Sequence, residues 1–232
     1  MKLGDVFHWL EPHLSVSVNK CCFRGQPRAW PLLPKAYRAE FSGPNGEFVE
    51  LAESRLRQWE AESQPYFHDS GFVPKSKHAL IALAQHFGLA TRALDWTSNP
   101  LVALFFAVID WEETDGELIA WRFESQIYNV VTAPESELAL FRPPPLHPRL
   151  RFQECLLSFH PSPDSLIPEN QLFRMSISAV DKAPLQYQLY RCGIHFESVF
   201  GSPDHLARKI NWISTNHMRR RTTVWNLPEK TS

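Results

Sequence analysis

Hydrophobic and polar positions follow two different periods along this chain. Apolar runs and alternating segments predict strands at residues 20–26, 91–96, 116–122, 150–159 and 173–179. Apolar residues spaced three or four positions apart predict a helix near the N-terminus and further helices over 47–61, 77–86, 101–110, 182–191 and 203–212. Helices gather in the first half and between strands, while strands crowd the centre. This order predicts an α+β fold, with a mainly antiparallel central sheet flanked by helices.

The most informative segment runs from Gln85 to Val108. Its strand-like part alternates, so Arg92 is expected to face one side of the sheet and Asp95 the other. Thr97-Ser98-Asn99-Pro100 supplies capping groups and a proline that favours the first helical turn. The helix that follows is apolar almost all round and is therefore expected to be buried. Polar groups held at such a strand-to-helix corner are typical of binding sites.

Composition predicts one domain over residues 1–232. With 44% hydrophobic residues, the chain can bury a large core without disulfides or metal. The proline-rich stretch 142–148 is interpreted as a rigid connector between strands. Because the net charge is −1, nucleic-acid contacts would depend on local clusters such as Arg149/Arg151 and Arg219–Arg221. No apolar run is long enough to cross a bilayer, so we expect a cytoplasmic protein without membrane partners.

The four cysteines suit a reducing compartment and do not predict a metal site. Cys21 and Cys22 are adjacent on an expected strand, so their side chains point to opposite faces. Cys192 and His195 have a ligand-like spacing but lack a second pair of ligands. A nucleic-acid hydrolase is disfavoured as well, because no paired carboxylates with metal-binding spacing occur.

A second polar cluster, Phe23-Arg24-Gly25-Gln26, ends the first expected strand. His86-Phe87-Gly88-Leu89 precedes the central segment Thr91 to Thr97, and Leu33 to Arg38, Arg149 to Gln153 and Gly193 to Ala207 contribute further motifs. On these residues the chain resembles the FRG domain family over nearly its whole length. Cys155 is a departure, because the family pattern would place a glycine there, after Gln153.

The segment Leu94 to Ser98, with the helix after it, is similar to the second motif of ADP-ribosyltransferases. This weaker resemblance implies a split central sheet, Arg24 as the first-motif residue, and the pair Gln153-Glu154 at the third motif, which is normally a glutamate. It implies that NAD is the substrate, that no metal is needed, and that ADP-ribose passes to a protein or nucleic-acid acceptor. The FRG resemblance further implies a bacterial toxin or phage-defence effector.

Cleavage of the bond between nicotinamide and ribose develops positive charge on the ribose. The reaction therefore needs a cation for the pyrophosphate, a hydroxyl near the ribose and an acceptor aimed at that charge. The catalytic candidates are Arg24, His86, Gln153 and Glu154, and the NAD-binding candidates are Arg24, Gly25, Gln26, Arg92, Asp95, Trp96, Thr97 and Ser98. Gly25 would let a ligand approach the backbone closely.

Strand alternation puts only one residue of the Gln153-Glu154 pair on the site face. Gln153 fits the FRG pattern, whereas Glu154 carries the carboxylate that this chemistry normally uses, and both remain open. We expect Arg24, His86, Thr97 and one of these two to line one cleft at the edge of the central strands.

Each candidate also has a purely structural interpretation. Arg24 could form an internal ion pair with Asp95, His86 could cap its helix, and Trp96 could belong to the core. The competing function is a non-catalytic module that senses a nucleotide or another phosphorylated ligand without cleaving it.

Overall fold

The computed structural model describes residues 1–17, 19–43, 46–67, 74–110, 113–144 and 152–222, with side chains described as far as residue 215. The helices are α1 (Leu3–Leu14), α2 (Phe48–Phe67), α3 (Lys77–His86), α4 (Pro100–Val108), α6 (Ala179–Arg191), α7 (Phe196–Phe200) and α8 (Pro203–Thr222). The strands are β1 (Cys21–Gln26), β2 (Ala93–Thr97), β3 (Gly116–Arg122), β4 (Tyr128–Asn129), β5 (Ala139–Arg142), β6 (Cys155–Phe159) and β7 (Leu172–Ile177). This confirms the predicted α+β class.

The strands form one seven-stranded sheet in the order β4-β5-β6-β2-β1-β3-β7. All neighbouring pairs are antiparallel except β4 and β5. β1 pairs with β3 along its whole length, and β2 does the same with β6. In contrast, β1 and β2 share only the residue pair Phe23↔Thr97. The sheet therefore consists of two well-paired halves, which are connected through this single residue pair and separate beside it.

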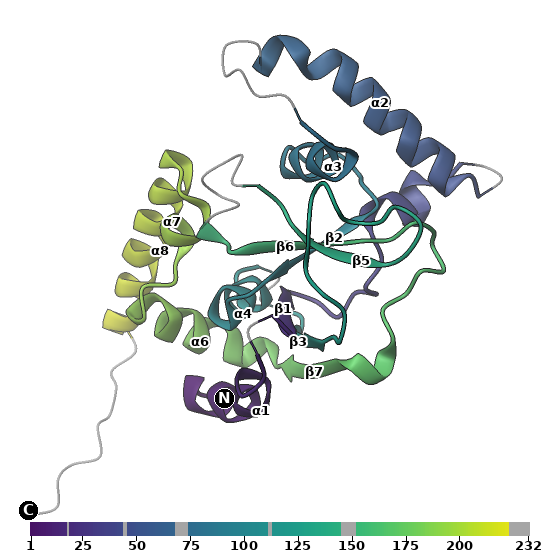
Figure 1. The fold of residues 1–232 in the computed structure, drawn as a ribbon. Coiled ribbons are helices and arrows are strands. Elements are labelled where there is room, and N and C mark those ends of the chain that lie inside the picture. The colour runs from purple at the N-terminus through teal and green to yellow at the C-terminus, as the bar shows by residue number, and fades with distance from the viewer. Residues whose placement is uncertain (18, 44–45, 68–73, 111–112, 145–151, 223–232) are drawn as a thin grey trace, which may run out of the picture.

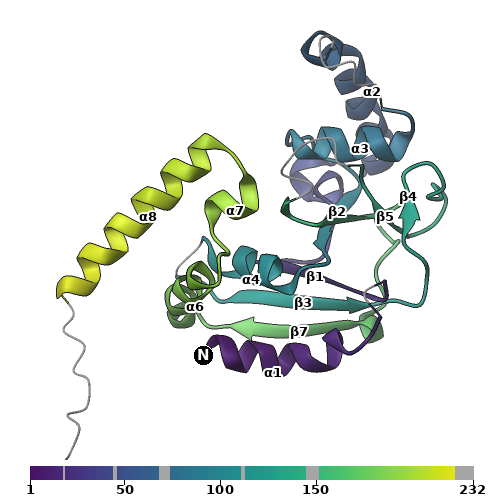
Figure 2. The same ribbon diagram turned by 60° about the vertical axis from the view of Figure 1, so that its left-hand side comes forward.

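Different helices cover the two halves (Figures 1 and 2). The apolar residues of α1, α4, α6 and α7 form one hydrophobic cluster against β1 and β3. Leu80, Ile81, Ala82 and Ala84 of α3 pack with β5 and β6 in a second cluster, and α2 crosses over α3. On the opposite face of the sheet, a third cluster contains Trp96 and Trp121. Within the described residues, no helix combines the length and the apolar character that a membrane span requires.

Two glycines let α4 lie directly on the sheet. A Cβ atom on Gly25 would lie 1.7 Å from the carbonyl oxygen of Ala103, and one on Gly116 would lie 2.2 Å from that of Ala107. No side chain fits at either position. Gly25 thus makes room for the helix, and it also lines the cavity described below, so the expectation that it lets a ligand approach the backbone stays a prediction.

Several predicted elements agree with the structure. The helix over 77–86 and the strand over 116–122 coincide with α3 and β3. The strand predicted over 150–159 begins only at Cys155. Gln153 and Glu154 lie in a turn before β6, so the alternation argument applied to this pair was wrong. Arg149, Arg151 and residues 145–148 of the proline-rich stretch lie outside the described residues, as do the side chains of Arg219–Arg221.

Candidate functional site

A cavity of about 240 Å³ lies between α3 and α4, above the point where β1 and β2 separate. Its polar lining consists of Arg24, Gln85, His86, Asp95, Thr97 and Gln153. Arg24, His86, Thr97 and Gln153 thus surround one cavity, although Arg24 and Gln153 are more than a hundred positions apart. Their chemical roles stay predictions.

Arg24 bridges the gap between the two halves of the sheet. Its Nη1 donates a hydrogen bond of 2.7 Å to the carbonyl oxygen of Asp95 in β2. Its Nε is buried and has no hydrogen-bond partner among the described residues. Burial lowers the pKa of the guanidinium, while the charge of Asp95 raises it and that of Arg38 lowers it. This hydrogen bond is thus to the backbone of Asp95 rather than to its carboxylate.

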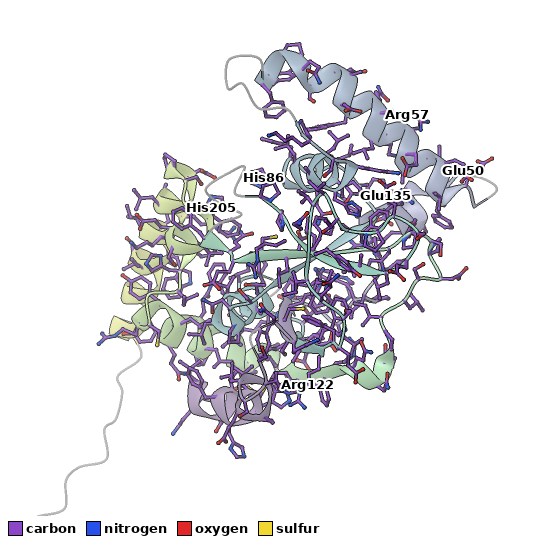
Figure 3. The ribbon with its side chains drawn as sticks, viewed as in Figure 1. Glu50, Arg57, His86, Arg122, Glu135 and His205 are labelled. Atoms are coloured by element: carbon purple, nitrogen blue, oxygen red, sulfur yellow. The ribbon has the colours of Figure 1, made fainter. Side chains whose placement is uncertain are left out.

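Asp95 and His86 line the cavity from two different elements. Asp95 is the exposed residue of an otherwise buried strand and shares the cavity face of β2 with Thr97. His86 ends α3, and its ring packs edge-on against Phe87 at 5.0 Å between ring centroids. Figure 3 shows His86 leaving α3 on the side opposite α2. The cavity therefore contains a carboxylate, an imidazole and a guanidinium.

Gln153 reaches the cavity from a turn that is held by hydrogen bonds. Thr97 Oγ1 donates to the carbonyl oxygen of Gln153 at 2.6 Å, and the Ser98 backbone N–H donates to that of Glu154 at 3.2 Å. The side chain of Gln153 lines the cavity, and its Nε2 is buried without a partner among the described residues. The turn thus presents an amide group to the cavity.

Glu154 belongs to the same turn but does not line the cavity. Its carboxylate accepts hydrogen bonds from Ser98 Oγ at 2.7 Å and from Asn99 Nδ2 at 3.4 Å. Its φ of 46° lies in the left-handed region, which non-glycine residues adopt at a cost. Glu154 therefore links the turn to the start of α4.

Asn99 is the residue that caps α4. Its Oδ1 accepts hydrogen bonds from the backbone N–H groups of Leu101 at 3.0 Å and Val102 at 3.3 Å. The expected capping role of Thr97 and Ser98 is therefore corrected, because these hydroxyls hold the turn around Gln153 instead.

Two predicted ligand-binding residues lie away from the cavity. Arg92 is buried, forms an ion pair with Glu53 of α2, and donates from Nη1 to the Pro161 carbonyl at 3.0 Å. Gln26 is also buried, and its amide donates to the carbonyl of Trp30 at 2.7 Å and to Glu117 Oε2 at 3.0 Å. Both side chains have protein partners and tie loops to the sheet.

Trp96 contributes to the cavity lining, but its ring belongs to the core. Nε1 donates to Ser158 Oγ at 3.0 Å, and the ring packs against Trp121 with centroids 5.2 Å apart. A role for this ring in stacking on a ligand in the cavity would require it to face the other side of the sheet.

Sequence reasoning missed several lining residues. Cys155 and Leu157 form part of the cavity floor because they pair with Thr97 and Asp95 in the sheet register. Phe106 of α4 and Gln85 of α3 line the walls. A prediction that paired β2 with β6 would have identified these residues of the cavity floor, since residues paired across two strands share a face of the sheet.

The described residues contain no group of three His, Cys, Asp or Glu side chains that could hold a metal ion. His195, which was considered with Cys192, accepts a hydrogen bond of 3.1 Å from the Ser198 N–H through Nδ1 and caps α7.

Comparisons with known proteins agree with part of the sequence interpretation. Searches of curated proteins and of solved structures found no match. The model of the FRG domain matches residues 19–116, a segment that includes Arg24, His86, Asp95 and Thr97. The matched segment ends at the first residue of β3, before the turn that carries Gln153. The family model therefore supports the resemblance to the FRG domain over residues 19–116.

Proposed function

We propose that the cavity binds NAD, cleaves the bond between nicotinamide and ribose, and transfers ADP-ribose to a macromolecular acceptor. One observation carries the proposal: Arg24 Nε and Gln153 Nε2 are buried N–H donors without a hydrogen-bond partner among the described residues, and both residues line the cavity that Asp95 also lines. Buried donors without partners are uncommon in folded proteins. An acceptor-rich anionic ligand would satisfy them.

In this proposal Arg24 contacts the pyrophosphate. A guanidinium in a partly buried site binds phosphate oxygens more strongly than one in water, and its planar fork favours two parallel hydrogen bonds. The bond from Nη1 to the Asp95 carbonyl fixes the direction of the side chain. Little conformational entropy would then be lost when the ligand binds.

Gln153 and Asp95 act at the ribose. When the bond breaks, its electron pair leaves with nicotinamide and positive charge develops on the ribose ring. The carboxylate of Asp95 stabilises that charge, while the amide of Gln153 positions the sugar through hydrogen bonds. We give this position to Gln153 because the carboxylate of Glu154 is bonded to Ser98 and Asn99 and does not line the cavity.

The size of the cavity suggests which end of NAD it takes. Its volume of about 240 Å³ is below the roughly 300–1,000 Å³ of common small-molecule sites. We therefore place the nicotinamide and its ribose inside and the adenosine toward the mouth. A role as a bacterial toxin or phage-defence effector is part of the same proposal and rests on the sequence resemblance alone.

A second candidate function is favoured by the position of Glu154. Because this carboxylate is turned toward α4, the described residues place no glutamate in the cavity, where ADP-ribosylation chemistry normally uses one. The same arginine and amide could then bind a nucleotide or another phosphorylated ligand without cleaving it.

Incubation with labelled NAD, with and without protein or DNA acceptors, tests both candidates. Release of nicotinamide by the wild-type protein, lost in Gln153→Ala and kept in Gln64→Ala, supports the enzyme. Gln64 is a matched control because it is an exposed glutamine on α2. Saturable binding of intact NAD supports the sensor. Absence of both release and binding contradicts the assignment of NAD to this cavity.

A further inference from the structure

A second hollow lies on the other side of the end of α3. This aromatic groove is lined by Arg55, Gln58, Trp59, Glu62, Ser63, Tyr66 and Phe67 of α2 and by Phe87 and Leu89 after α3. Its volume of about 570 Å³ falls within the range of small-molecule sites. The groove shares no lining residue with the cavity, although His86 and Phe87 are consecutive.

The aromatic groove exposes large rings to solvent. Tyr66 is 85% exposed and Phe87 is 55% exposed. The rings of Trp59 and Phe87 lie within 24° of parallel with centroids 6.4 Å apart, and Phe67 contacts both. Two exposed and two half-buried rings thus gather in one hollow. A contiguous apolar patch of this kind is typical of a binding surface, whereas scattered exposed apolar residues are not. A flat aromatic group would find stacking partners here.

Arg55 provides a positive charge at one end of the groove. Its Nη2 donates to the carbonyl of Phe41 at 2.6 Å, and its guanidinium lies 5.5 Å from the centre of the Phe41 ring. These contacts hold the side chain in place. Its Nη1 is buried without a hydrogen-bond partner, and no carboxylate pairs with Arg55 among the described residues.

The spacing along α2 fixes the expected orientation of a ligand. Arg55 precedes Trp59 by about one helical turn, or roughly 6 Å, so a group attached to a ring stacked on Trp59 can reach the guanidinium. Glu62 lies on the other side of Trp59 and accepts a hydrogen bond of 2.9 Å from Gln58. Its charge disfavours a second anion there.

We propose that the aromatic groove is a second binding site, which takes a planar aromatic small molecule carrying a negatively charged group. The ring packs against Trp59 and Phe87, and the anion contacts Arg55. This inference does not depend on the activity proposed for the cavity, because the two sites use different residues.

Binding of 2-naphthoate to the full chain, measured by calorimetry, tests the proposal. Saturable binding at one site is expected, with an affinity about tenfold lower in Arg55→Gln, which loses a charge-assisted contact. Phe87→Ala should weaken binding by a similar factor through lost stacking. Because Phe87 is exposed, this variant is expected to fold normally, and its thermal unfolding checks that point. Neutral 2-naphthamide should bind more weakly and be insensitive to Arg55→Gln.

Two control variants separate this site from other surfaces. Arg24→Ala removes the guanidinium of the cavity, and Val131→Ala shortens an exposed apolar residue that does not line the groove. Both should bind 2-naphthoate like the wild-type protein. Loss of binding in Arg24→Ala but not in Arg55→Gln would overturn the proposal, as would equal affinity for 2-naphthamide or no saturable binding.

Discussion

Arg24 lies on β1 and Arg92 immediately precedes β2, yet their surroundings differ. Arg92 has an ion pair with Glu53, a hydrogen bond to Pro161, and a ring contact with Phe159 at 4.8 Å. Arg24 donates one hydrogen bond to a backbone carbonyl, and its buried Nε has no hydrogen-bond partner among the described residues. The sequence suggested a ligand-binding role for both.

The difference teaches that the partners of an arginine, rather than its burial, indicate its role. A guanidinium whose donors are used by the protein holds elements together, here α2 and the loop after β6 against the sheet. A guanidinium with unused donors beside a cavity can bind an anion. Substitution of the first should therefore affect folding, and substitution of the second should affect binding.

The largest effect is expected for Arg92→Ala. Removing one partner of a buried ion pair leaves the other charge uncompensated, which typically costs about 3–5 kcal/mol. Glu53 also contacts Lys77, so part of the loss is offset and the lower end of that range applies. Chemical denaturation measures the change. If Arg92→Ala unfolds like the wild-type protein, Arg92 does not have the structural role that its contacts indicate.

An effect of similar size concerns pH and His160, whose backbone N–H donates a hydrogen bond to the carbonyl of Arg92. Burial lowers the pKa of His160 to about 4, the carbonyl of Ser165 raises it and the charge of Arg24 lowers it. In the unfolded chain this histidine takes up a proton near pH 6.5, whereas in the folded protein it stays neutral down to about pH 4. The free energy of unfolding should therefore fall by about 3 kcal/mol between pH 6.5 and 4 because of this residue. His160→Gln should show a shallower loss of stability over the same window. His13, whose pKa burial also lowers to about 4, contributes in the same direction and remains in the variant.

The next prediction separates Gln153 from Glu154. Gln153→Ala should lower nicotinamide release about 100-fold, or by about 2.7 kcal/mol of lost stabilisation, because the amide lines the cavity. Glu154→Gln keeps a hydrogen-bonding group beside Ser98 and Asn99 and should retain most of the activity. The reverse result would assign the catalytic role to Glu154. Equal activity in both variants would remove this turn from the mechanism.

Much of the fold could be predicted from the sequence where local signals are strong. At the start of α3 the Ser76 side chain accepts a hydrogen bond from Ala79 N, and a regular apolar pattern follows. The bounds of this helix could therefore be predicted. The short strands β4 and β5 depend on pairing between distant residues and were missed. The turn at Gln153 was misjudged because the positive φ of Glu154 interrupts the strand pattern.

The candidate site was predictable in part. The resemblance pointed to Arg24, His86, Thr97 and Gln153, which the fold brings around one cavity. The partners of Arg92 and Gln26 could not be predicted, because Glu53 and Glu117 are distant in sequence and become neighbours only after folding. The role of Gly25 also required the structure, since only the packed helix shows why a side chain is excluded.

The affinity of the Arg24→Ala variant for NAD tests the central claim most directly. Loss of a charge-assisted contact to the pyrophosphate should weaken binding by roughly ten- to a hundredfold, corresponding to about 1.5–3 kcal/mol. The thermal unfolding of the variant should stay close to that of the wild-type protein. Unchanged NAD affinity in a folded Arg24→Ala protein would contradict the claim that this arginine and its cavity bind the nucleotide.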